Sequence, residues 1–221
     1  MLVRDRMTSP VLTVEPRTHL HEALALMKSR HIRRLPVVKN RRLVGIVTFT
    51  DLMRAQPSSA NSLAVWEIPA LLLKSFVSEI MTKGLVTISP TASIEEAAVL
   101  MRQHKIGGLP VVEQGALLGI VTESDIFDAF VDLMGLRRGG TRLTIDLERA
   151  QRLDEVVRTV RDCDAEIHSL AAYSVNGHRE VVVRVDRPYP LHLVQTMTER
   201  GLRVTHLAAL PEDQSKEERK K

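Results

Sequence analysis

Residues 43–51, LVGIVTFTD, recur later in the chain as LLGIVTESD at residues 117–125. Each copy begins as a short apolar run, which is typical of a strand, and ends in polar residues that are typical of a helix start. A threonine and an aspartate stand at this junction in both copies, Thr48 with Asp51 and Thr122 with Asp125. The pattern predicts one structural unit that the chain uses twice.

The repeat extends well beyond these two stretches. Residues 3–55 align with residues 77–129 without a gap, and both copies contain the run Leu-Pro-Val-Val, at 35–38 and at 109–112. A unit of about 55 residues has too little interior to be stable alone. We therefore expect the two copies to cover each other's apolar faces.

Hydrophobic spacing predicts the order strand, helix, strand, strand, helix in each copy. In the first copy we expect a strand at 11–14, a helix from about residue 20 to residue 30 capped by Thr18, and a hairpin of strands 35–38 and 43–48. A polar turn at 40–42 joins the two hairpin strands, and a second helix is expected from about Asp51.

The rest of the chain divides into linkers and a third folded region. Alternating and helical patterns over residues 142–209 predict the order β-α-β-β-α-β, which is ferredoxin-like, with Asn176-Gly177 as a hairpin turn. We place the first repeat at 1–56, a linker with a helix around Trp66 at 57–75, the second repeat at 76–134, a linker at 135–141, and a disordered charged tail at 210–221. The predicted fold class is α/β (α+β).

Composition narrows the function classes. The chain has 221 residues, 44% of them hydrophobic and 26% charged, as expected for a globular protein that buries a core. Its single cysteine, Cys163, excludes an intramolecular disulfide and a multi-cysteine zinc site, and no metal site is predicted. No apolar run is long enough to span a bilayer and no signal peptide is evident, so we expect a cytoplasmic protein.

The charge balance is compatible with anionic partners of two kinds. The net charge of +4 suits a small anionic ligand as well as nucleic acid. Aromatic residues make up only 3% of the chain, which argues against stacking platforms for single-stranded nucleic acid.

Two interpretations fit the Thr-x-x-Asp junctions. Free N–H groups at a helix start favour an anion, Asp51 can accept hydrogen bonds from the vicinal hydroxyls of a ribose, and Thr48 can donate to a phosphate oxygen. Alternatively, Thr50 or Ser124 caps the helix and the aspartate only complements its dipole. The residues alone leave both interpretations open.

The paired motifs, Leu-Pro-Val-Val followed by Gly-Ile-Val-Thr-x-x-Asp, resemble a tandem pair of CBS domains, a Bateman module, over about residues 1–133. The resemblance implies a flat pseudo-twofold disc with two clefts that bind adenine nucleotides. It places the ribose on Asp51 and Asp125, the phosphate near Thr48 and Thr122, and the adenine against Leu12 and Val86.

The resemblance also points to the two residues before Leu-Pro-Val as phosphate-facing positions. They are Arg33-Arg34 in the first copy and Gly107-Gly108 in the second. Arginine suits phosphate oxygens. The cleft with glycines is expected to borrow charge from Arg33 or Arg34, to use Lys105, or to bind a less charged ligand.

Residues 142–209 resemble an ACT domain, and the order of parts resembles that of the AcuB-like acetoin-utilisation proteins. ACT domains that bind amino acids carry a glycine in the loop after the first strand. The loop here, residues 148–152, contains none, so we expect a role in dimerisation rather than amino-acid binding.

Together these features predict a non-enzymatic ligand sensor that binds AMP, ADP, ATP or S-adenosylmethionine as a regulatory ligand, without a catalytic cofactor. We expect a homodimer. The alternatives are a nucleic-acid-binding regulator that uses the basic cluster Arg30–Arg42, and an inert dimerisation scaffold. CBS pairs also occur inside enzymes such as inosine monophosphate dehydrogenase, but this chain has no separate barrel-sized segment, reactive-cysteine signature or P-loop.

Overall fold

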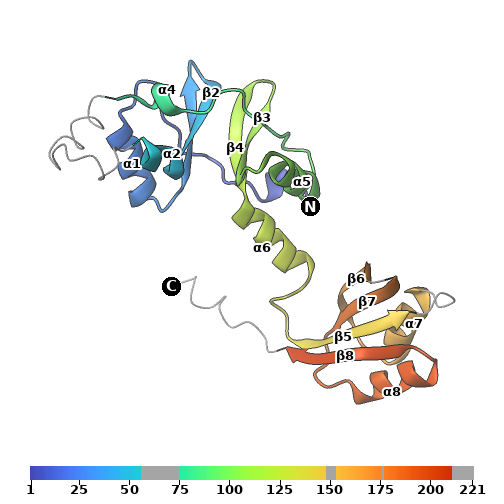
Figure 1. The fold of residues 1–221 in the computed structure, drawn as a ribbon. Helices are drawn as coiled ribbons and strands as arrows, with labels where there is room; N and C mark the ends of the chain where they lie inside the picture. Colours follow the sequence, from blue (N-terminus) through green and yellow to red (C-terminus); the bar gives the residue numbers. More distant parts are fainter. Residues whose placement is uncertain (56–74, 148–152, 176, 211–221) are drawn as a thin grey trace. The chain divides into compact units, whose positions relative to one another are not determined.

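The computed structural model describes residues 1–55, 75–147, 153–175 and 177–210. The chain divides into two compact units, Met1–Phe127 and Asp128–Lys221; Figure 1 colours it from blue to red along the sequence. The segment around Trp66, the loop 148–152, Asn176 and the tail from residue 211 lie outside the described residues. The predictions made for them stay predictions.

The two repeats fold into the same succession of elements, which confirms the predicted helix–strand–strand–helix order in both copies. The first contains η1 (Val3–Asp5), α1 (Leu20–Ser29), β1 (Arg34–Lys39), β2 (Arg42–Thr48) and α2 (Phe49–Arg54). The second contains α4 (Val77–Ile80), α5 (Ile94–His104), β3 (Gly108–Glu113), β4 (Ala116–Thr122) and α6 (Glu123–Leu133).

The strand predicted at 11–14 is wrong as a regular strand. Only Val14 pairs with the hairpin, through a single parallel bridge to Val37, in which Val14 N donates to Pro36 O at 3.1 Å and Val38 N donates to Val14 O at 2.9 Å. Pro10 and Pro16 flank this short segment and lack the N–H that a longer ladder needs. The segment therefore stays extended without becoming a strand.

The cap predicted for the first helix is also wrong. The residue before α1 is His19, whose backbone N donates to Glu22 Oε2 at 3.0 Å. The Thr18 hydroxyl instead accepts from Glu15 N at 3.1 Å and closes the preceding turn. In the second repeat the position that corresponds to His19 is Ser93, and its hydroxyl accepts from Glu96 N at 3.0 Å, as a capping serine does.

The two hairpins form one four-stranded sheet in the order β1-β2-β4-β3. Asn40 and Arg41 both have positive φ, 50° and 62°, as a two-residue hairpin turn requires. The pair Arg42↔Ala116 joins the two hairpins. Each hairpin has one register shift at the same place, after Val37 and after Val111.

The N-terminal segment of each repeat pairs with the hairpin of the other repeat. Thr8 N donates to Ile120 O at 2.9 Å, and Ile120 N donates to Thr8 O at 3.2 Å. Thr82 and Ile46 exchange the corresponding bonds at 2.9 and 3.1 Å. This exchange couples the two copies and brings the residues after Thr8 to the junction between β4 and α6.

Glycines make this close approach possible. A Cβ atom on Gly119 would lie 2.7 Å from Thr8 O and 2.8 Å from Met7 Sδ. On Gly45 it would lie 2.5 Å from Met81 Sδ and 3.1 Å from Thr82 O. Gly119 is therefore required by the backbone of the opposite repeat, whereas at Gly45 the nearest atom belongs to the flexible side chain of Met81.

The core of the first repeat follows the predicted helical spacing. Leu20, Ala23 and Met27 of α1 are buried against Leu35 and Val37 of β1. Val47 and Leu52 complete this core from the second half of the hairpin and from α2.

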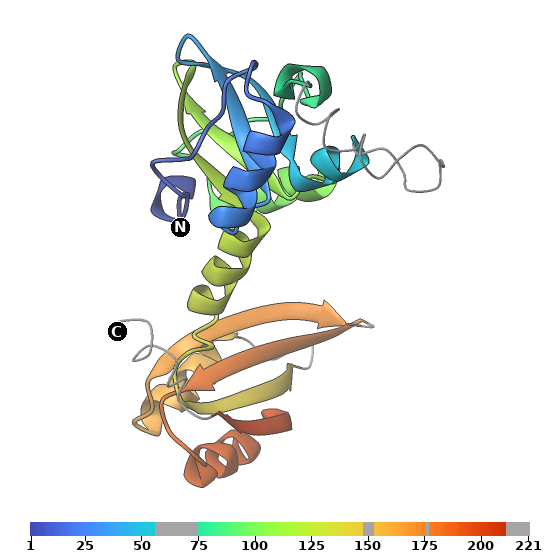
Figure 2. The same ribbon diagram turned by 90° about the vertical axis from the view of Figure 1, so that its left-hand side faces the viewer.

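The second unit has the predicted β-α-β-β-α-β order, which confirms the ferredoxin-like succession. Its elements are β5 (Gly140–Leu147), α7 (Leu153–Asp162), β6 (Ile167–Val175), β7 (His178–Val185), α8 (Leu191–Glu199) and β8 (Arg203–Leu210). The strands pair antiparallel in the order β6-β7-β5-β8, and Figure 2 shows β6 and β7 as long orange arrows running in opposite directions. β5 begins inside the segment predicted as the linker 135–141.

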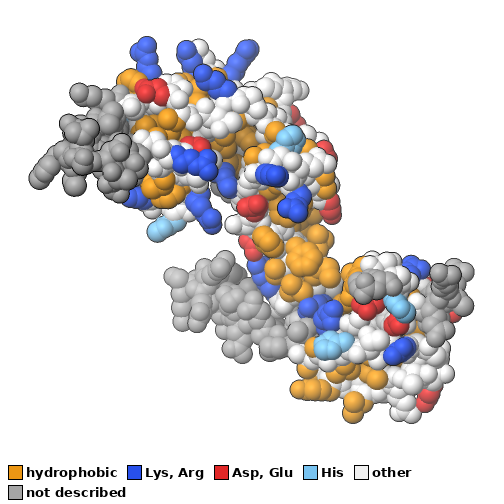
Figure 3. All heavy atoms as spheres, viewed as in Figure 1, with side chains coloured by type: hydrophobic (Ala, Val, Ile, Leu, Met, Phe, Trp, Pro, Cys, Tyr) orange, Lys and Arg blue, Asp and Glu red, His pale blue; other side chains and the backbone are white. Residues whose placement is uncertain are grey.

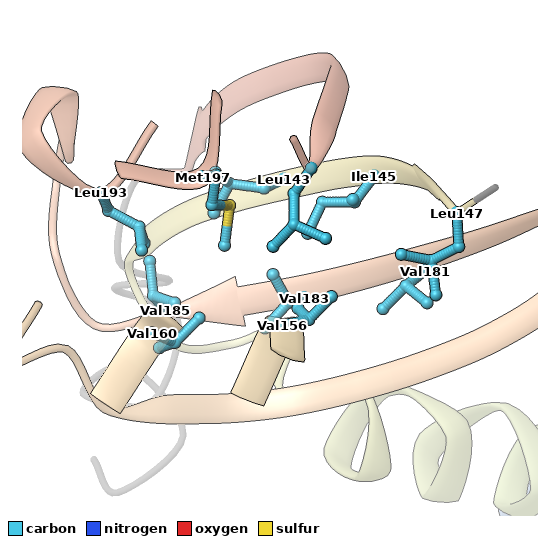
Figure 4. Close-up of a cluster of buried hydrophobic side chains, with 11 residues drawn as sticks. Leu143, Ile145, Leu147, Val156, Val160, Val181, Val183, Val185, Leu193 and Met197 are labelled. Atoms are coloured by element: carbon cyan, nitrogen blue, oxygen red, sulfur yellow. The ribbon is translucent and has the colours of Figure 1, made fainter. Parts of the chain in front are cut away.

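The core of this unit lies between the sheet and its two helices. Every second residue of β5 and β7 points into it, including Leu143, Ile145, Val181 and Val183, and Figure 4 shows these side chains facing Val156 and Val160 of α7 and Leu193 and Met197 of α8. The alternation that predicted a strand at 143–147 is therefore confirmed, as is the return strand predicted at 181–185. Assignment of this fold to the ACT family stays a prediction.

Gly119→Ala is expected to lower the free energy of unfolding by about 1–3 kcal/mol, because the new methyl group meets the Thr8 carbonyl of the opposite repeat. Urea denaturation measures this change. Glu113→Gln, at the exposed end of β3, is the control and is expected to change stability by less than about 0.5 kcal/mol. An equally small loss for both variants would contradict the role of Gly119.

Candidate functional site

The Thr-Asp pair of the first repeat closes the start of α2. Thr48 is the residue before the helix, and its N and Oγ1 both donate to Asp51 Oδ2, at 2.8 and 2.7 Å. Asp51 N donates in return to Thr48 Oγ1 at 3.2 Å. The cap is therefore Thr48, and the alternative in which Thr50 caps this helix is wrong.

The second repeat repeats this arrangement at the start of α6. Thr122 N and Oγ1 both donate to Asp125 Oδ2 at 2.7 Å. Among the described residues, no hydrogen bond to Oδ1 of either aspartate is recorded. One carboxylate oxygen thus holds the helix start, and among the described residues the other accepts no hydrogen bond, so capping does not rule out the binding interpretation, which stays a prediction.

The hydroxyls of the two threonines are engaged within the protein. Thr48 and Thr122 donate their hydroxyl protons to Asp51 and Asp125, and their predicted contact with a phosphate stays a prediction. Each threonine orients its aspartate.

A cavity of about 400 Å³ lies where the two repeats cross. The first repeat supplies the segment after Thr8 and the entry to β1, and the second supplies the junction of β4 and α6. Four of the predicted site residues line this cavity: Leu12, Arg33, Arg34 and Thr122. Asp125 is not among the lining residues, but its hydrogen-bond partner Thr122 is.

The remaining lining residues were not predicted. They are Thr8, Pro10, Val11, His31, Ile32, Ile120, Glu123 and Ser124. The sequence contains no local sign of this grouping, because it depends on the exchange of the Thr8 and Thr82 segments between the repeats. The alignment of the two copies would have suggested this grouping only if the N-terminal segment of each copy had been placed against the hairpin of the other copy.

The other predicted residues lie elsewhere. Thr48, Asp51 and Val86 correspond by the repeat to Thr122, Asp125 and Leu12, and they belong to the second crossing, where Thr82 pairs with Ile46. They do not line the cavity described above.

Gly107 and Gly108 lie under the side chain of Arg34. A Cβ on Gly107 would lie 2.6 Å from Arg34 Nη2, and a Cβ on Gly108 would lie 3.0 Å from Arg34 Cδ. The arginine of the first copy thus occupies the space that side chains of the second copy would need. The two glycines are matched to Arg34.

The electrostatic environment of Arg34 combines burial with three neighbouring charges. Burial lowers the pKa of its guanidinium, the carboxylate of Glu123 opposes that shift, Arg33 adds to it, and Asp125 opposes it in turn. A buried guanidinium is stabilised in its charged form by a nearby anion.

The lining suits a ligand with a flat apolar part and a polar part. Val11, Leu12, Ile32 and Ile120 supply apolar surface, and the start of α6 supplies hydroxyl and backbone N–H groups. Within residues 1–55, 75–147, 153–175 and 177–210, no three His, Cys, Asp or Glu side chains are grouped as a metal site requires. Nor does any helix in those ranges have the length and apolar character needed to cross a membrane.

Comparison with known families agrees with the repeat. The sequence model of the CBS domain matches residues 3–58 and 77–132, which are the two copies. The CBS domain-containing protein YhcV of Bacillus subtilis is 35% identical over 142 residues, which cover 64% of this chain and 92% of YhcV.

Two solved structures are similar to the first part of the chain. AcuB from Vibrio cholerae has a TM-score of 0.52 at 34% identity, and the match covers 62% of this chain and 94% of that one. The CBS domain pair of protein MJ0100, solved in complex with 5′-methylthioadenosine and S-adenosyl-L-methionine, has a TM-score of 0.50 at 30% identity, and covers 59% of this chain and 95% of its own.

Asp125→Ala is expected to lower the free energy of unfolding by about 1 kcal/mol, because Thr122 N and Oγ1 both lose their acceptor. Asp125→Asn keeps an oxygen at that position and is expected to lose less than half as much. Urea denaturation of both variants beside wild type measures the difference. An alanine variant as stable as wild type would show that the aspartate does not hold the helix start.

Proposed function

Because the chain belongs to the CBS-domain family, with one copy of the domain at residues 3–58 and another at residues 77–132, we propose that it is a non-catalytic regulatory protein that binds an adenosyl ligand between the two copies. The ligand class comprises adenine nucleotides and related adenosyl compounds. The single observation that carries the proposal is the cavity of about 400 Å³, to which both repeats contribute.

Residue chemistry supports a specific arrangement. The side chains of Val11, Leu12 and Ile120 all line the cavity and offer apolar surface for an adenine ring. Oδ1 of Asp125 accepts from the ribose hydroxyls, since Oδ2 is engaged by Thr122. The substituent on the ribose 5′ carbon then meets Arg33 and Ser124, which line the same cavity.

The similarity to the MJ0100 pair supports an adenosyl ligand in particular. That pair was solved with 5′-methylthioadenosine and S-adenosyl-L-methionine, and it is 30% identical in a match that covers 59% of this chain. The two ligands share the adenine and the ribose and differ in the charge of the 5′ substituent, so we expect the adenine and the ribose to be recognised here as well.

Regulation follows from differential affinity. A ligand held between two repeats favours the relative orientation that it fits best, and so shifts the population of conformations. Helix α6 begins at the cavity with Glu123 and continues to Leu133, beyond the first residue of the second unit. We propose that this helix and the ACT-like second unit transmit the change to a partner enzyme.

The binding assignment is tested by isothermal titration calorimetry with adenosine, after a thermal-shift screen of adenosyl compounds. Asp125→Asn is expected to weaken binding at least tenfold, because the NH2 group that replaces Oδ1 is a donor and cannot accept from the ribose hydroxyls. Asp51→Asn removes the corresponding carboxylate at the other crossing and is expected to change the affinity less than twofold. A loss that follows Asp51 rather than Asp125 would move the site to that crossing, and the absence of any adenosyl binding would overturn the proposed function.

Nucleic-acid binding is the second candidate, because exposed cations gather at one end of the β1–β2 hairpin. Lys39, Arg41 and Arg42 are all exposed, and Figure 3 shows basic side chains at this end of the first unit. Binding through phosphates would weaken steeply with salt. Filter binding of duplex DNA at two salt concentrations distinguishes the candidates, and we expect no binding at physiological salt.

We also propose that the protein forms a homodimer through α6. Phe127, Phe130 and Leu133 recur at helical spacing on this helix, with exposed fractions of 70%, 52% and 49%, and Figure 3 shows hydrophobic side chains gathered over it. Exposed apolar surface of this kind marks an interaction site.

Phe130→Ser is therefore expected to convert the dimer into a monomer in analytical ultracentrifugation. Leu191→Ser, at an exposed apolar position on α8, is the matched control and is expected to leave the dimer intact. A monomeric wild-type protein, or a dimer that survives the change at Phe130, would contradict this interface.

A further inference from the structure

The two repeats differ at the first residue of their last helices, where the fold is otherwise the same. This residue is Phe49 in the first repeat and Glu123 in the second. Phe49 packs on the apolar core of its repeat, together with Leu24 and Ile32. A carboxylate cannot be buried there without a large desolvation cost, so Glu123 stays exposed and lines the cavity between the repeats.

The side chains of Glu123 and Arg34 both lie close to Gly107. An added Cβ on Gly107 would lie 2.6 Å from Arg34 Nη2 and 2.8 Å from Glu123 Oε2. Both charged groups therefore rest against one backbone position. The absence of a side chain at Gly107 is what allows the guanidinium and the carboxylate to share that space.

The Glu123 carboxylate beside Arg34 changes the net charge that a ligand meets in the cavity. Two arginines line the cavity. The positive charge of Arg34 is offset by the negative charge of Glu123, and Asp125 adds a second carboxylate nearby. Arg33 is exposed to solvent, where its charge is screened. A phosphate chain at the start of α6 would lie beside the Glu123 carboxylate, whereas an uncharged or cationic group would not be repelled.

We propose that Glu123 is a specificity-determining residue, which makes this cavity prefer adenosyl ligands with an uncharged or cationic 5′ substituent over those with a phosphate chain. The inference rests on the proposed function, because it concerns the same cavity. In this proposal, Glu123 determines which 5′ substituent the cavity accepts among ligands that have the same adenine and ribose.

The test compares adenosine, 5′-methylthioadenosine, S-adenosylmethionine, AMP and ATP by isothermal titration calorimetry on the full chain. Wild type is expected to bind 5′-methylthioadenosine at least fivefold more tightly than ATP. Glu123→Gln is expected to raise the affinity for ATP at least fivefold, to lower that for S-adenosylmethionine, and to leave that for adenosine within twofold. Glu113→Gln removes one negative charge from an exposed position of the same repeat and is expected to change every affinity less than twofold.

The outcomes separate the two proposals. If adenosine binds but Glu123→Gln leaves the ratio of ATP to 5′-methylthioadenosine affinity within twofold of wild type, the role of Glu123 is overturned and the proposed function stands. The same holds if wild type binds ATP more tightly than 5′-methylthioadenosine. If no ligand binds wild type, the proposed function fails and the inference fails with it. Thermal melts of both variants show whether the fold is retained.

Discussion

The first unit depends on the close approach of one backbone to another at two glycines. Gly119 admits the carbonyl of Thr8, and Gly45 admits Thr82, so that each repeat completes its hairpin with a segment from the other. A half of this size buries so little apolar surface that it would be only marginally stable alone. The exchange solves that problem, and it has a second consequence, because the cavity exists only where a segment of one repeat lies beside the strand–helix junction of the other.

Sequence patterns predicted most of the fold because the signals are local. The helical spacing of Leu20, Ala23 and Met27 and the alternation in β5 each reflect which side chains face a core. The two wrong predictions, the Thr18 cap and the strand at 11–14, also have local causes. Thr18 looks like a cap, but the helix is capped one residue later, at His19, and the Thr18 hydroxyl closes the preceding turn instead. Residues 11–14 carry a strand-like pattern, but they lie between prolines that prevent a ladder.

The site was harder to predict for a different reason. The Thr-Asp spacing is visible in the sequence, but it does not show that one carboxylate oxygen is engaged by the threonine and that the other is left over. Leu12, Arg33, Arg34 and Thr122 were expected to face a ligand, yet their meeting in one cavity depends on contacts between residues that are far apart in sequence. Glu123 carries no sequence signal of its own, and its position becomes informative only beside Phe49 and Gly107.

The central claim is that an adenosyl ligand binds in the cavity built by both repeats, with its ribose on Asp125. A crystal structure of the full chain grown with 5′-methylthioadenosine tests this most directly. We predict the adenine between Leu12 and Ile120, and the ribose hydroxyls within hydrogen-bond distance of Asp125 Oδ1. A ligand bound elsewhere on the chain, with Asp125 contacting only Thr122, would contradict the account.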